Sequence, residues 1–419
     1  MACDSADRPL HVGLLSYRTN PYSGGQGVYV RHLASHLQAL GHHVTVVSGP
    51  PRPELPAGVG LIHLPGLDLY DPANPFRLPR AGELADPVNL LEWLGVASGG
   101  FPEPLTFGLR VARLFAAAPP AFDVLHDNQS LSYGLLRLRR RIPLVATVHH
   151  PLSLDRRWAV RAERSPVRKL QRWRWYSCIG MQRRVARRIP HLIAVSQAAR
   201  RDFAREYRID PGRMRVIPNG IDTDTFRPLA GVPREPGRIL VTHSADIPMK
   251  GLAVLLRAIA GIGRPVRLVV VGEFREAGEN AHLAAALGLS GRLEIARRLG
   301  REELVRQYAR AWVAVVPSLY EGFGFPAGEA MACAVPVVAT TAGALPEVVG
   351  EAGLLVPPGE AAPLGRALRR LLDDPGAARR LGEAGRERVL RLFSWRRAAA
   401  DTAAVYREAI RDHRRFRTP

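Results

Sequence analysis

Short apolar runs alternate with helical stretches along most of this chain, a pattern typical of parallel sheets covered by helices on both faces. Each run has the length of one buried strand. The first series is "LHVGLL" (10–15), "HVTVVS" (43–48), "FDVLH" (122–126), "PLVATVHH" (143–150) and "HLIAVS" (191–196). The second is "RILVTHS" (238–244), "VRLVVVGE" (266–273), "LEIA" (293–296), "WVAVVPS" (312–318), "VPVVAT" (335–340) and "GLLVPP" (353–358). We therefore predict an α/β protein with two doubly wound parallel-sheet domains in tandem.

A segment rich in proline and glycine, "PLAGVPREPG" (228–237), separates the two series and indicates a linker. The predicted organisation is an N-terminal Rossmann-like domain over 8–228, a linker over 229–237 and a C-terminal Rossmann-like domain over 238–392. A last helical stretch over 393–419 lies beyond the final strand, from where it can return to the N-terminal domain.

Length and composition exclude some other classes of protein. The 419 residues suit two to three domains, and no apolar run approaches the roughly 18 residues of a membrane span. The N-terminal "MACDSADRPL" has neither the basic start nor the apolar core of a signal peptide. Cys3, Cys178 and Cys333 lie far apart in the sequence and fit neither a disulfide framework nor a zinc site. We expect a reduced, cytoplasmic protein, with a peripheral place on the inner face of the membrane left open.

The formal net charge is +21, and all but two of the basic residues are arginine. Such a charge is consistent with a solvated surface or with an anionic partner. The segment 156–188 has twelve basic residues, one acid and interleaved Trp and Tyr side chains. It would suit an anionic membrane or an acceptor at its surface. Stacking on nucleic acid, or a helical face whose tryptophans pack inward, would explain it as well.

The stretch "EGFGFPAGEA" (321–330) follows a predicted buried strand, where ligands bind in parallel sheets. Gly322 and Gly324 allow close backbone approach, and Pro326 suits the first turn of a helix. The N-terminus of that helix favours an anion such as phosphate. Glu321 and Glu329 flank the turn, and a carboxylate can accept both hydroxyls of a diol. The pattern fits a nucleotide-sugar, and it equally fits two solvated glutamates.

This stretch and its continuation "MACAVPVVATTAGALPEVV" resemble the retaining glycosyltransferases of family GT4, which have the GT-B fold. The same resemblance extends to "GGQGVYVRHLASHLQALGHHVTVVS", "VLHDNQS", "VATVHH", "VIPNGID" and the lysine of "PMKGL". Together these motifs cover residues from about 10 to about 408. The resemblance implies two Rossmann-like domains that face each other across a cleft, with a C-terminal helix that crosses back to the first domain.

The resemblance also assigns roles to individual residues. Glu329 would hold the ribose hydroxyls, Glu321 would face the transferred sugar, and Lys250 would neutralise the diphosphate. His149 matches the family's active-site histidine, so the implied catalytic residues are His149, Glu321 and Lys250. Lys250, Glu321 and Glu329 would bind the donor together with Gly24, Gly25, Asn219, Gly220, Gly322, Phe323, Gly324 and Phe325.

The chain lacks one positively charged residue that the family pattern contains. The family usually has an arginine five positions before the lysine, where this chain has Ala245. Arg275 and Arg18 are the candidates to supply the second positive charge.

The function implied is sugar transfer from a nucleotide diphosphate-sugar to an acceptor hydroxyl, with retention of anomeric configuration, as in a hexosyltransferase. The donor is a co-substrate, and neither a metal nor another cofactor is expected. The nucleotide base, the sugar and the acceptor are left open by the sequence. No nucleic-acid partner is expected.

Two other constellations are weaker. Asp222 and Asp224 form a D-x-D that could bind a metal, but its place after an Asn-Gly turn favours a turn role. His149 and His150 are adjacent on a strand and point to opposite faces, so they cannot easily share an ion. We expect His150 and His126 to pack or to form hydrogen bonds.

Three alternative functions are weighed against transfer. A non-catalytic nucleotide-sugar or glycan-binding protein would explain Ala245, and a basic nucleic-acid-binding protein would explain the net charge. A Rossmann oxidoreductase is disfavoured because no G-x-G-x-x-G follows the first strand of either domain.

Overall fold

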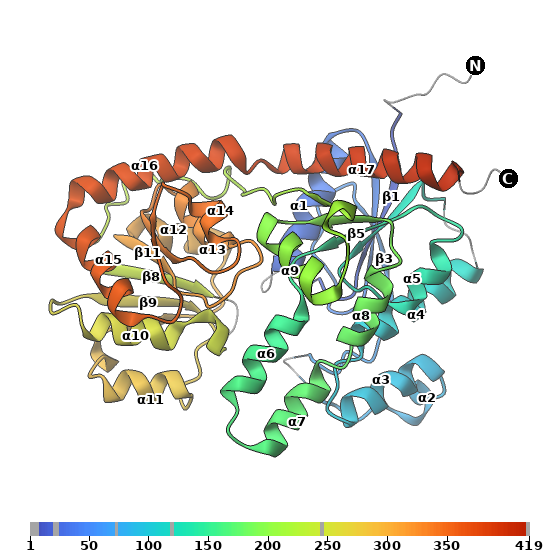
Figure 1. The fold of residues 1–419 in the computed structure, drawn as a ribbon, viewed down its shortest axis with the longest axis horizontal. Coiled ribbons are helices and arrows are strands. Elements are labelled where there is room, and N and C mark those ends of the chain that lie inside the picture. Colours follow the sequence, from blue (N-terminus) through green and yellow to red (C-terminus); the bar gives the residue numbers. More distant parts are fainter. Residues whose placement is uncertain (1–7, 20–24, 72–73, 118–120, 244–246, 416–419) are drawn as a thin grey trace. The chain divides into compact units, whose positions relative to one another are not determined.

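The computed structural model describes residues 8–19, 25–71, 74–117, 121–243 and 247–415 (Figure 1). They form two compact units. Unit 1 holds the chain up to Val195, Ala199–Ile217 and the C-terminal segment from Trp395. Unit 2 holds Ser196–Ala198 and Pro218–Ser394. Among the described residues, no helix is both long and apolar enough to span a bilayer.

Unit 1 contains a seven-stranded sheet in the order β3-β2-β1-β4-β5-β6-β7, with every neighbouring pair parallel. Its central strands are continuous apolar runs because helices cover both faces. The strands are β1 (His11–Ser16), β2 (His43–Ser48), β3 (Gly60–His63), β4 (Val124–Asn128), β5 (Leu144–Val148), β6 (His191–Ala194) and β7 (Met214–Val216).

Unit 2 contains a six-stranded sheet in the order β10-β9-β8-β11-β12-β13, again parallel throughout. The predicted pair of doubly wound sheets is therefore confirmed. The strands are β8 (Arg238–His243), β9 (Arg267–Gly272), β10 (Leu293–Ala296), β11 (Val313–Val316), β12 (Val337–Thr340) and β13 (Leu354–Val356).

Both sheets reverse their strand order next to their first strand. In unit 1 the reversal lies between β1 and β4, and in unit 2 it lies between β8 and β11. Crevices at the carboxyl ends of such strand pairs are where open α/β sheets bind ligands. The loops after β1, β4, β8 and β11 are therefore the places to look for a site.

The helices of unit 1 include one from the far end of the sequence. Helix α17 packs against α1 and against β4, β5 and β6, and its buried face includes Trp395 and Tyr406 (Figure 1). The predicted C-terminal helix is thus present and packs on the first unit. The helices are α1 (Gly25–Ala39), α2 (Ala81–Leu84), α3 (Pro87–Ala97), α4 (Glu103–Ala117), α5 (Tyr133–Leu138), α6 (Leu152–Ala162), α7 (Pro166–Trp175), α8 (Ile179–Ala186), α9 (Gln197–Tyr207), with the turn η1 (Pro211–Arg213), and α17 (Trp395–Arg415).

The core of unit 2 is built from the inward faces of its strands and of α10 and α15, with Leu255, Leu268 and Leu368 fully buried. Its helices and short turns are η2 (Pro248–Lys250), α10 (Leu252–Ala260), α11 (Glu279–Ala286), η3 (Ser290–Arg292), α12 (Arg301–Arg310), α13 (Phe325–Ala332), α14 (Leu345–Val349), α15 (Ala361–Asp373) and α16 (Pro375–Leu392).

Residues 218–228 pack with unit 2, whereas the sequence placed them at the end of the N-terminal domain. The Ile221 N–H donates to the Phe393 carbonyl over 2.9 Å. The Ile221 side chain also fills the space beside Gly328, where an added Cβ would lie 2.4 Å from it. These contacts tie the segment to unit 2 ahead of the proline-rich stretch.

Candidate active site

Lys250 and Glu321 meet at the strand reversal of unit 2. Lys250 follows β8, Glu321 follows β11, and Lys250 Nζ lies 2.7 Å from Glu321 Oε1. The hydroxyl of Ser318 donates to the same carboxylate oxygen over 2.8 Å. Both charged side chains are mostly buried. The structure therefore brings together two of the three side chains that the sequence suggested as catalytic.

A glycine holds Lys250 in this position. Gly251 has a φ of +72°, and an added Cβ would lie 1.9 Å from the carbonyl oxygen of Pro317. The Leu319 N–H donates to the Met249 carbonyl over 2.8 Å and joins the two loops again. The lysine loop and the glutamate loop are thus locked backbone to backbone.

The glycine turn leading into α13 is closely packed. Gly324 has a φ of +104° and lies against Leu345. The rings of Phe323 and Phe325 contact edge to face, with centroids 5.2 Å apart. The Gly322 carbonyl accepts a hydrogen bond from the Ser196 hydroxyl over 2.7 Å. Because Gly324 ends the turn in the left-handed region, α13 can begin at Phe325, with Pro326 in its first turn.

Glu329 lies one turn into α13 and has a partner that the sequence did not suggest. The Tyr308 hydroxyl, on α12, donates to Glu329 Oε2 over 3.0 Å. A second contact of 3.0 Å joins this hydroxyl to Thr242 Oγ1 on β8. Burial raises the pKa of the Glu329 carboxyl to about 7. Glu321 and Glu329 therefore have different partners and different electrostatic surroundings.

Asn219 and Gly220 follow Pro218, the residue at which the main part of unit 2 begins. Asn219 is almost fully buried, and among the described residues neither its side-chain oxygen nor its nitrogen has a hydrogen-bond partner. The next acidic residue, Asp222, accepts the N–H of Thr225 over 3.1 Å. The turn role expected for the D-x-D segment is thus confirmed.

His149 lies at the carboxyl end of β5 in unit 1 and is almost completely buried. Its Nε2 is 2.7 Å from Asn128 Oδ1, a carbonyl oxygen that can only accept, so Nε2 carries the proton. The ring of Tyr29 packs edge to face on the imidazole, with centroids 4.9 Å apart. Burial lowers the pKa of His149 to about 3, and the ring is therefore neutral near pH 7.

The two neighbouring histidines are structural. His126 bonds the hydroxyls of Thr147, at 2.7 Å, and Tyr406, at 2.6 Å, and burial lowers its pKa to about 3. His150 Nε2 lies 2.7 Å from Asp155 Oδ2. The expected packing and hydrogen-bonding roles of His126 and His150 are confirmed.

The first glycine loop is only partly described. Gly25 is the first residue of α1 and is exposed, while Gly24 and Ala245 lie outside the described residues. Of the two candidates for a second cation, Arg18 is paired with Glu103 at 3.0 Å in unit 1. Arg275 is exposed in the loop after β9.

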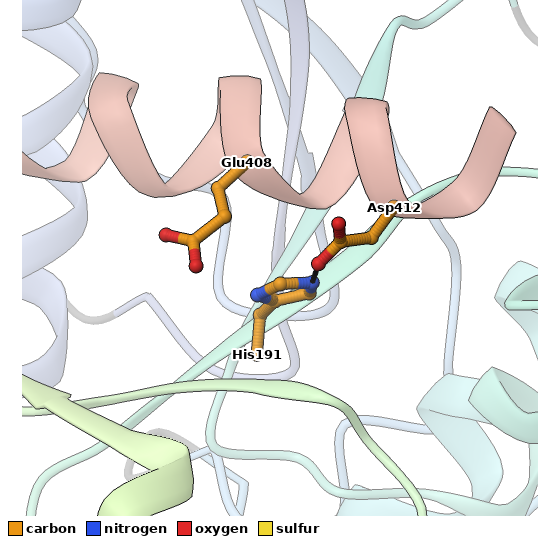
Figure 2. Close-up of side chains that lie close together, drawn as sticks. All are labelled: His191, Glu408 and Asp412. Carbon is orange, nitrogen blue, oxygen red and sulfur yellow. Dashed lines mark ion pairs between the residues drawn. The ribbon is translucent and has the colours of Figure 1, made fainter. Parts of the chain in front are cut away.

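One group of described side chains has spacing that could hold a metal ion. Figure 2 shows His191 facing Glu408 and Asp412 of α17, and one ligand atom from each lies within 4.8 Å of the others. His191 Nε2 is 3.4 Å from Asp412 Oδ2, and the Arg215 guanidinium donates a hydrogen bond to Glu408 Oε2 over 3.2 Å. The positive charge of Arg215 disfavours a metal cation at this group. His191 begins β6, whereas His149 follows the end of β5, so the group lies at the opposite end of the strands from His149.

Sequence reasoning missed the residues that position the predicted ones. Ser318 was visible three positions before Glu321, and its small hydroxyl at a strand end was the only available signal. Tyr308 comes from a helix whose inward face carries no chemical signature. Asn128, the partner of His149, was part of a motif in the resemblance but had no role assigned.

Two family models match the chain. Residues 23–225 match Glycosyltransferase Family 4, and residues 230–388 match Glycosyl transferases group 1. The chain is 47% identical to the "MMP alpha-(1->4)-mannosyltransferase" of Mycolicibacterium hassiacum, over 96% of this chain and 98% of that protein. The chain belongs to glycosyltransferase family 4. This glycosyltransferase is also 31% identical to the "D-inositol 3-phosphate glycosyltransferase" of Streptomyces bingchenggensis, over 98% and 92% of the two chains.

Solved structures agree with this assignment. The glycosyltransferase superposes on sucrose-phosphate synthase from Thermosynechococcus elongatus with a TM-score of 0.74 and 26% identity, over 97% of this chain and 100% of the other. Together with the two parallel sheets, this similarity assigns the GT-B fold. The chain is therefore an enzyme of the glycosyltransferase class.

Proposed function

We propose that the enzyme transfers a mannosyl group from a nucleotide diphosphate-mannose to an acceptor hydroxyl, with retention of anomeric configuration and without a metal. The sugar is inferred from the 47% identical relative named as an α-(1→4)-mannosyltransferase. The observation that carries the chemistry is the contact between Lys250 and Glu321 at the strand reversal of unit 2.

In this proposal Lys250 binds the departing diphosphate. Cleavage of the anomeric C–O bond leaves negative charge on the diphosphate and positive charge on the anomeric carbon. Lys250 and the N-terminus of α13 stabilise the negative charge on the diphosphate. Because both groups are already in position before the bond breaks, little protein reorganisation is needed as the charge develops. Glu321 holds the lysine before the donor binds and then faces the transferred sugar, which its second oxygen can contact.

The remaining residues orient the donor. The Glu329 carboxylate accepts the ribose hydroxyls, and the backbone of Gly322, Phe323, Gly324 and Phe325 lines the sugar site. Gly24 and Gly25 close over the phosphates, while Asn219 and Gly220 complete the donor site. His149, neutral and protonated on Nε2, offers its Nδ1 lone pair to a hydroxyl of the transferred sugar.

Retention follows if the acceptor attacks the face from which the diphosphate departs. The acceptor oxygen forms its bond to the anomeric carbon while the sugar–phosphate bond breaks. The acceptor proton passes to an oxygen of the leaving diphosphate, so no protein base is needed. Arg275 is a candidate for the second positive charge, because it lies in the loop after β9, which ends at the same edge of the unit 2 sheet as the loops of Lys250 and Glu321.

The proposal is tested with GDP-, UDP- and ADP-mannose and the matching glucose donors. Turnover is measured by release of the nucleoside diphosphate, with and without EDTA, and the product anomer is assigned by NMR. We expect transfer from a mannose donor, retained configuration and no loss of rate in EDTA. An inverted product, or a rate restored only by added metal, contradicts the corresponding part of the proposal.

We also propose that α7 contacts an anionic lipid surface. No residue of α7 is buried, and Val167, Leu170 and Trp173 are 66%, 68% and 57% exposed at a spacing of three residues. This spacing places them on one side of the helix, among the cations Arg168, Lys169 and Arg172. Apolar residues flanked by cations are suited to an anionic bilayer surface.

Vesicle sedimentation tests this surface. We expect the enzyme to bind phosphatidylglycerol vesicles, to bind phosphatidylcholine vesicles much less, and to dissociate with rising salt. The double change Leu170→Ser and Trp173→Ser should abolish binding, whereas Leu390→Ser, at an exposed leucine of unit 2, should not. Self-association through α7 in place of lipid binding, detected by sedimentation velocity, would contradict the proposal.

A further inference from the structure

Helix α3 of unit 1 carries apolar side chains on its solvent-facing side. The helix packs against α2 and α4 (Figure 1). Leu90, Leu91 and Leu94 are 39%, 41% and 51% exposed, and their spacing places them on one face of the helix. Pro87 and Ala97, one turn away at either end of that face, are exposed as well. The outer face of α3 is therefore an apolar stripe along the length of the helix.

The carboxylate and the amide of α3, on Glu92 and Asn89, make their contacts inside unit 1. Glu92 is buried, pairs with Arg110 at 2.6 Å and accepts the hydroxyl of Thr106 over 3.0 Å. Asn89 Nδ2 donates to the Glu83 carbonyl over 2.9 Å. A surface helix normally has the opposite orientation, with its apolar face toward the core and its polar face toward water. The core of unit 1 therefore does not account for the outward leucines.

The loop that leads into α2 and α3 adds two more exposed apolar side chains. Phe76 and Leu78 are 62% and 83% exposed. Arg77, between them, pairs with Glu83 at 2.7 Å, and this pair holds the loop beside α2. Of the eleven large apolar side chains that are exposed in the described part of the chain, five lie between Phe76 and Leu94. Such a concentration on a protein surface indicates a contact with another molecule.

The charges around this surface cancel. Residues 74–117 contain four arginines and four acidic residues, in a chain whose net charge is +21. Three of the four arginines are paired with acids of the same range. The pairs are Arg77 with Glu83 at 2.7 Å, Arg110 with Glu92 at 2.6 Å and Arg113 with Asp86 at 2.9 Å.

This neutrality distinguishes α3 from α7. The exposed apolar residues of α7 lie among cations of the same helix, as an anionic lipid surface requires. Helix α3 has no basic residue, and Glu92, its one acid, is buried in an ion pair. The α3 surface therefore lacks the charge that would attract an anionic bilayer, and it fits a neutral, apolar protein surface.

We propose that the outer face of α3, together with Phe76 and Leu78, binds the same face of a second copy of this chain. A two-fold interface places one patch against itself, so the patch must be complementary to itself. Two copies that each carry a net charge of +21 repel each other. They can approach closely where the local charge is balanced and apolar side chains meet, and the α3 surface satisfies both conditions. The inference is independent of the donor and the acceptor of the enzyme.

The size of the surface predicts the strength of the dimer. Helix α3 has 11 residues and is about 16 Å long. A stable interface buries about 800 Å² on each partner, which is more than one face of such a helix supplies. Phe76 and Leu78 are therefore needed to enlarge the contact. We expect a reversible dimer with a dissociation constant of about 1–100 µM.

Sedimentation velocity of the full-length enzyme tests the dimer. Between about 1 and about 200 µM protein, the weight-average sedimentation coefficient should rise from the monomer value toward the dimer value. Raising the salt from about 0.1 M to about 1 M shortens the screening length from about 10 Å to about 3 Å. An apolar interface between two like-charged copies should not weaken under this change, whereas an interface held by ion pairs should.

Serine variants locate the interface. We expect the double change Leu90→Ser and Leu94→Ser to raise the dissociation constant at least about tenfold, because each copy loses two buried leucine side chains. Leu390→Ser is the matched control, since Leu390 in unit 2 is 51% exposed, as Leu94 is. The control and the α7 change Leu170→Ser with Trp173→Ser should dimerise like the wild type. Equal melting temperatures at about 1 µM, where all variants are monomers, would show that they are folded.

The inference is overturned by several results. One is a monomer at every concentration of the wild type. Another is a dimer that the α3 change leaves intact or that the α7 change dissociates, because the interface would then lie elsewhere. Loss of vesicle binding in the α3 variant would assign the stripe to lipid and would overturn the choice of a second copy. An enzyme without the proposed transfer activity that still dimerises through α3 would leave this inference standing.

Discussion

At the scale of single residues, the contact between Lys250 and Glu321 has two consequences. The ion pair holds the lysine in place, and it leaves a mostly buried carboxylate that depends on that lysine. We expect Lys250→Ala to lower kcat by roughly 10²–10³, the range seen when one group that stabilises a developing charge is removed. Single-turnover kinetics with saturating donor measure the effect. A loss confined to KM would mean that the lysine only binds the donor.

Glu329 predicts a pH dependence. Its pKa is raised from 4.5 to about 7, so the proton stabilises the folded state. That stabilisation is complete below pH 4.5 and is lost as the pH rises through 7. Glu329→Gln should therefore raise the melting temperature at pH 8 and change it little at pH 4. The donor KM of the wild type should rise below pH 7, and the Gln variant should bind donor roughly tenfold more weakly with a flat profile.

The control for this experiment is Glu302→Gln, an exposed glutamate in the first turn of α12. It should leave both the melting temperature and the donor profile unchanged. Equal shifts in the two variants would show that the effect does not come from the buried carboxyl.

The sequence predicts those features of the site that depend on neighbouring residues. The spacing of Glu321 and Glu329, with the glycines between them, is contained in one stretch of ten residues. The pairing of Lys250 with Glu321 was not predicted, since it joins loops 71 positions apart. The neutral state of His149 and the raised pKa of Glu329 depend on burial by residues from other elements, which no local pattern reports.

At the scale of elements, the turn that carries Lys250 depends on Gly251. We expect Gly251→Ala to destabilise the protein by about 2 kcal/mol or more, because the residue has a positive φ and its Cβ would overlap the Pro317 carbonyl. Gly261→Ala, at the other end of α10, has φ −87° and ordinary contacts at 3.6 Å. Urea unfolding of both variants checks this, and equal losses would contradict the role of the turn.

The strands were predictable because buried parallel strands are continuous apolar runs. All the predicted runs contain strands, including β10 at the edge of its sheet. Two strands were missed, β3 (Gly60–His63) and β7 (Met214–Val216), since edge strands are short and only partly covered. The turn and cap residues, by contrast, placed the start of α13 to within one residue.

At the scale of the whole molecule, unit 1 is built from both ends of the chain. Deletion of 395–419 would remove the helix that buries Trp395 and Tyr406 and would leave His126 without its Tyr406 partner. Calorimetry of this deletion should show the loss of one unfolding transition and the survival of another that belongs to unit 2. The milder Tyr406→Phe should lower the first transition without abolishing it. A single unchanged transition in the deletion would contradict the division into two units.

This arrangement also determines the order in which the two units can fold during translation. A ribosome releases residues 218–394, which make up nearly all of unit 2, before the helix that completes unit 1 has emerged. The first half of the nascent polypeptide must therefore wait, with its sheet incompletely covered, until residues 395–415 have been translated. A message cut short before residue 395 yields a product that can never complete its first unit.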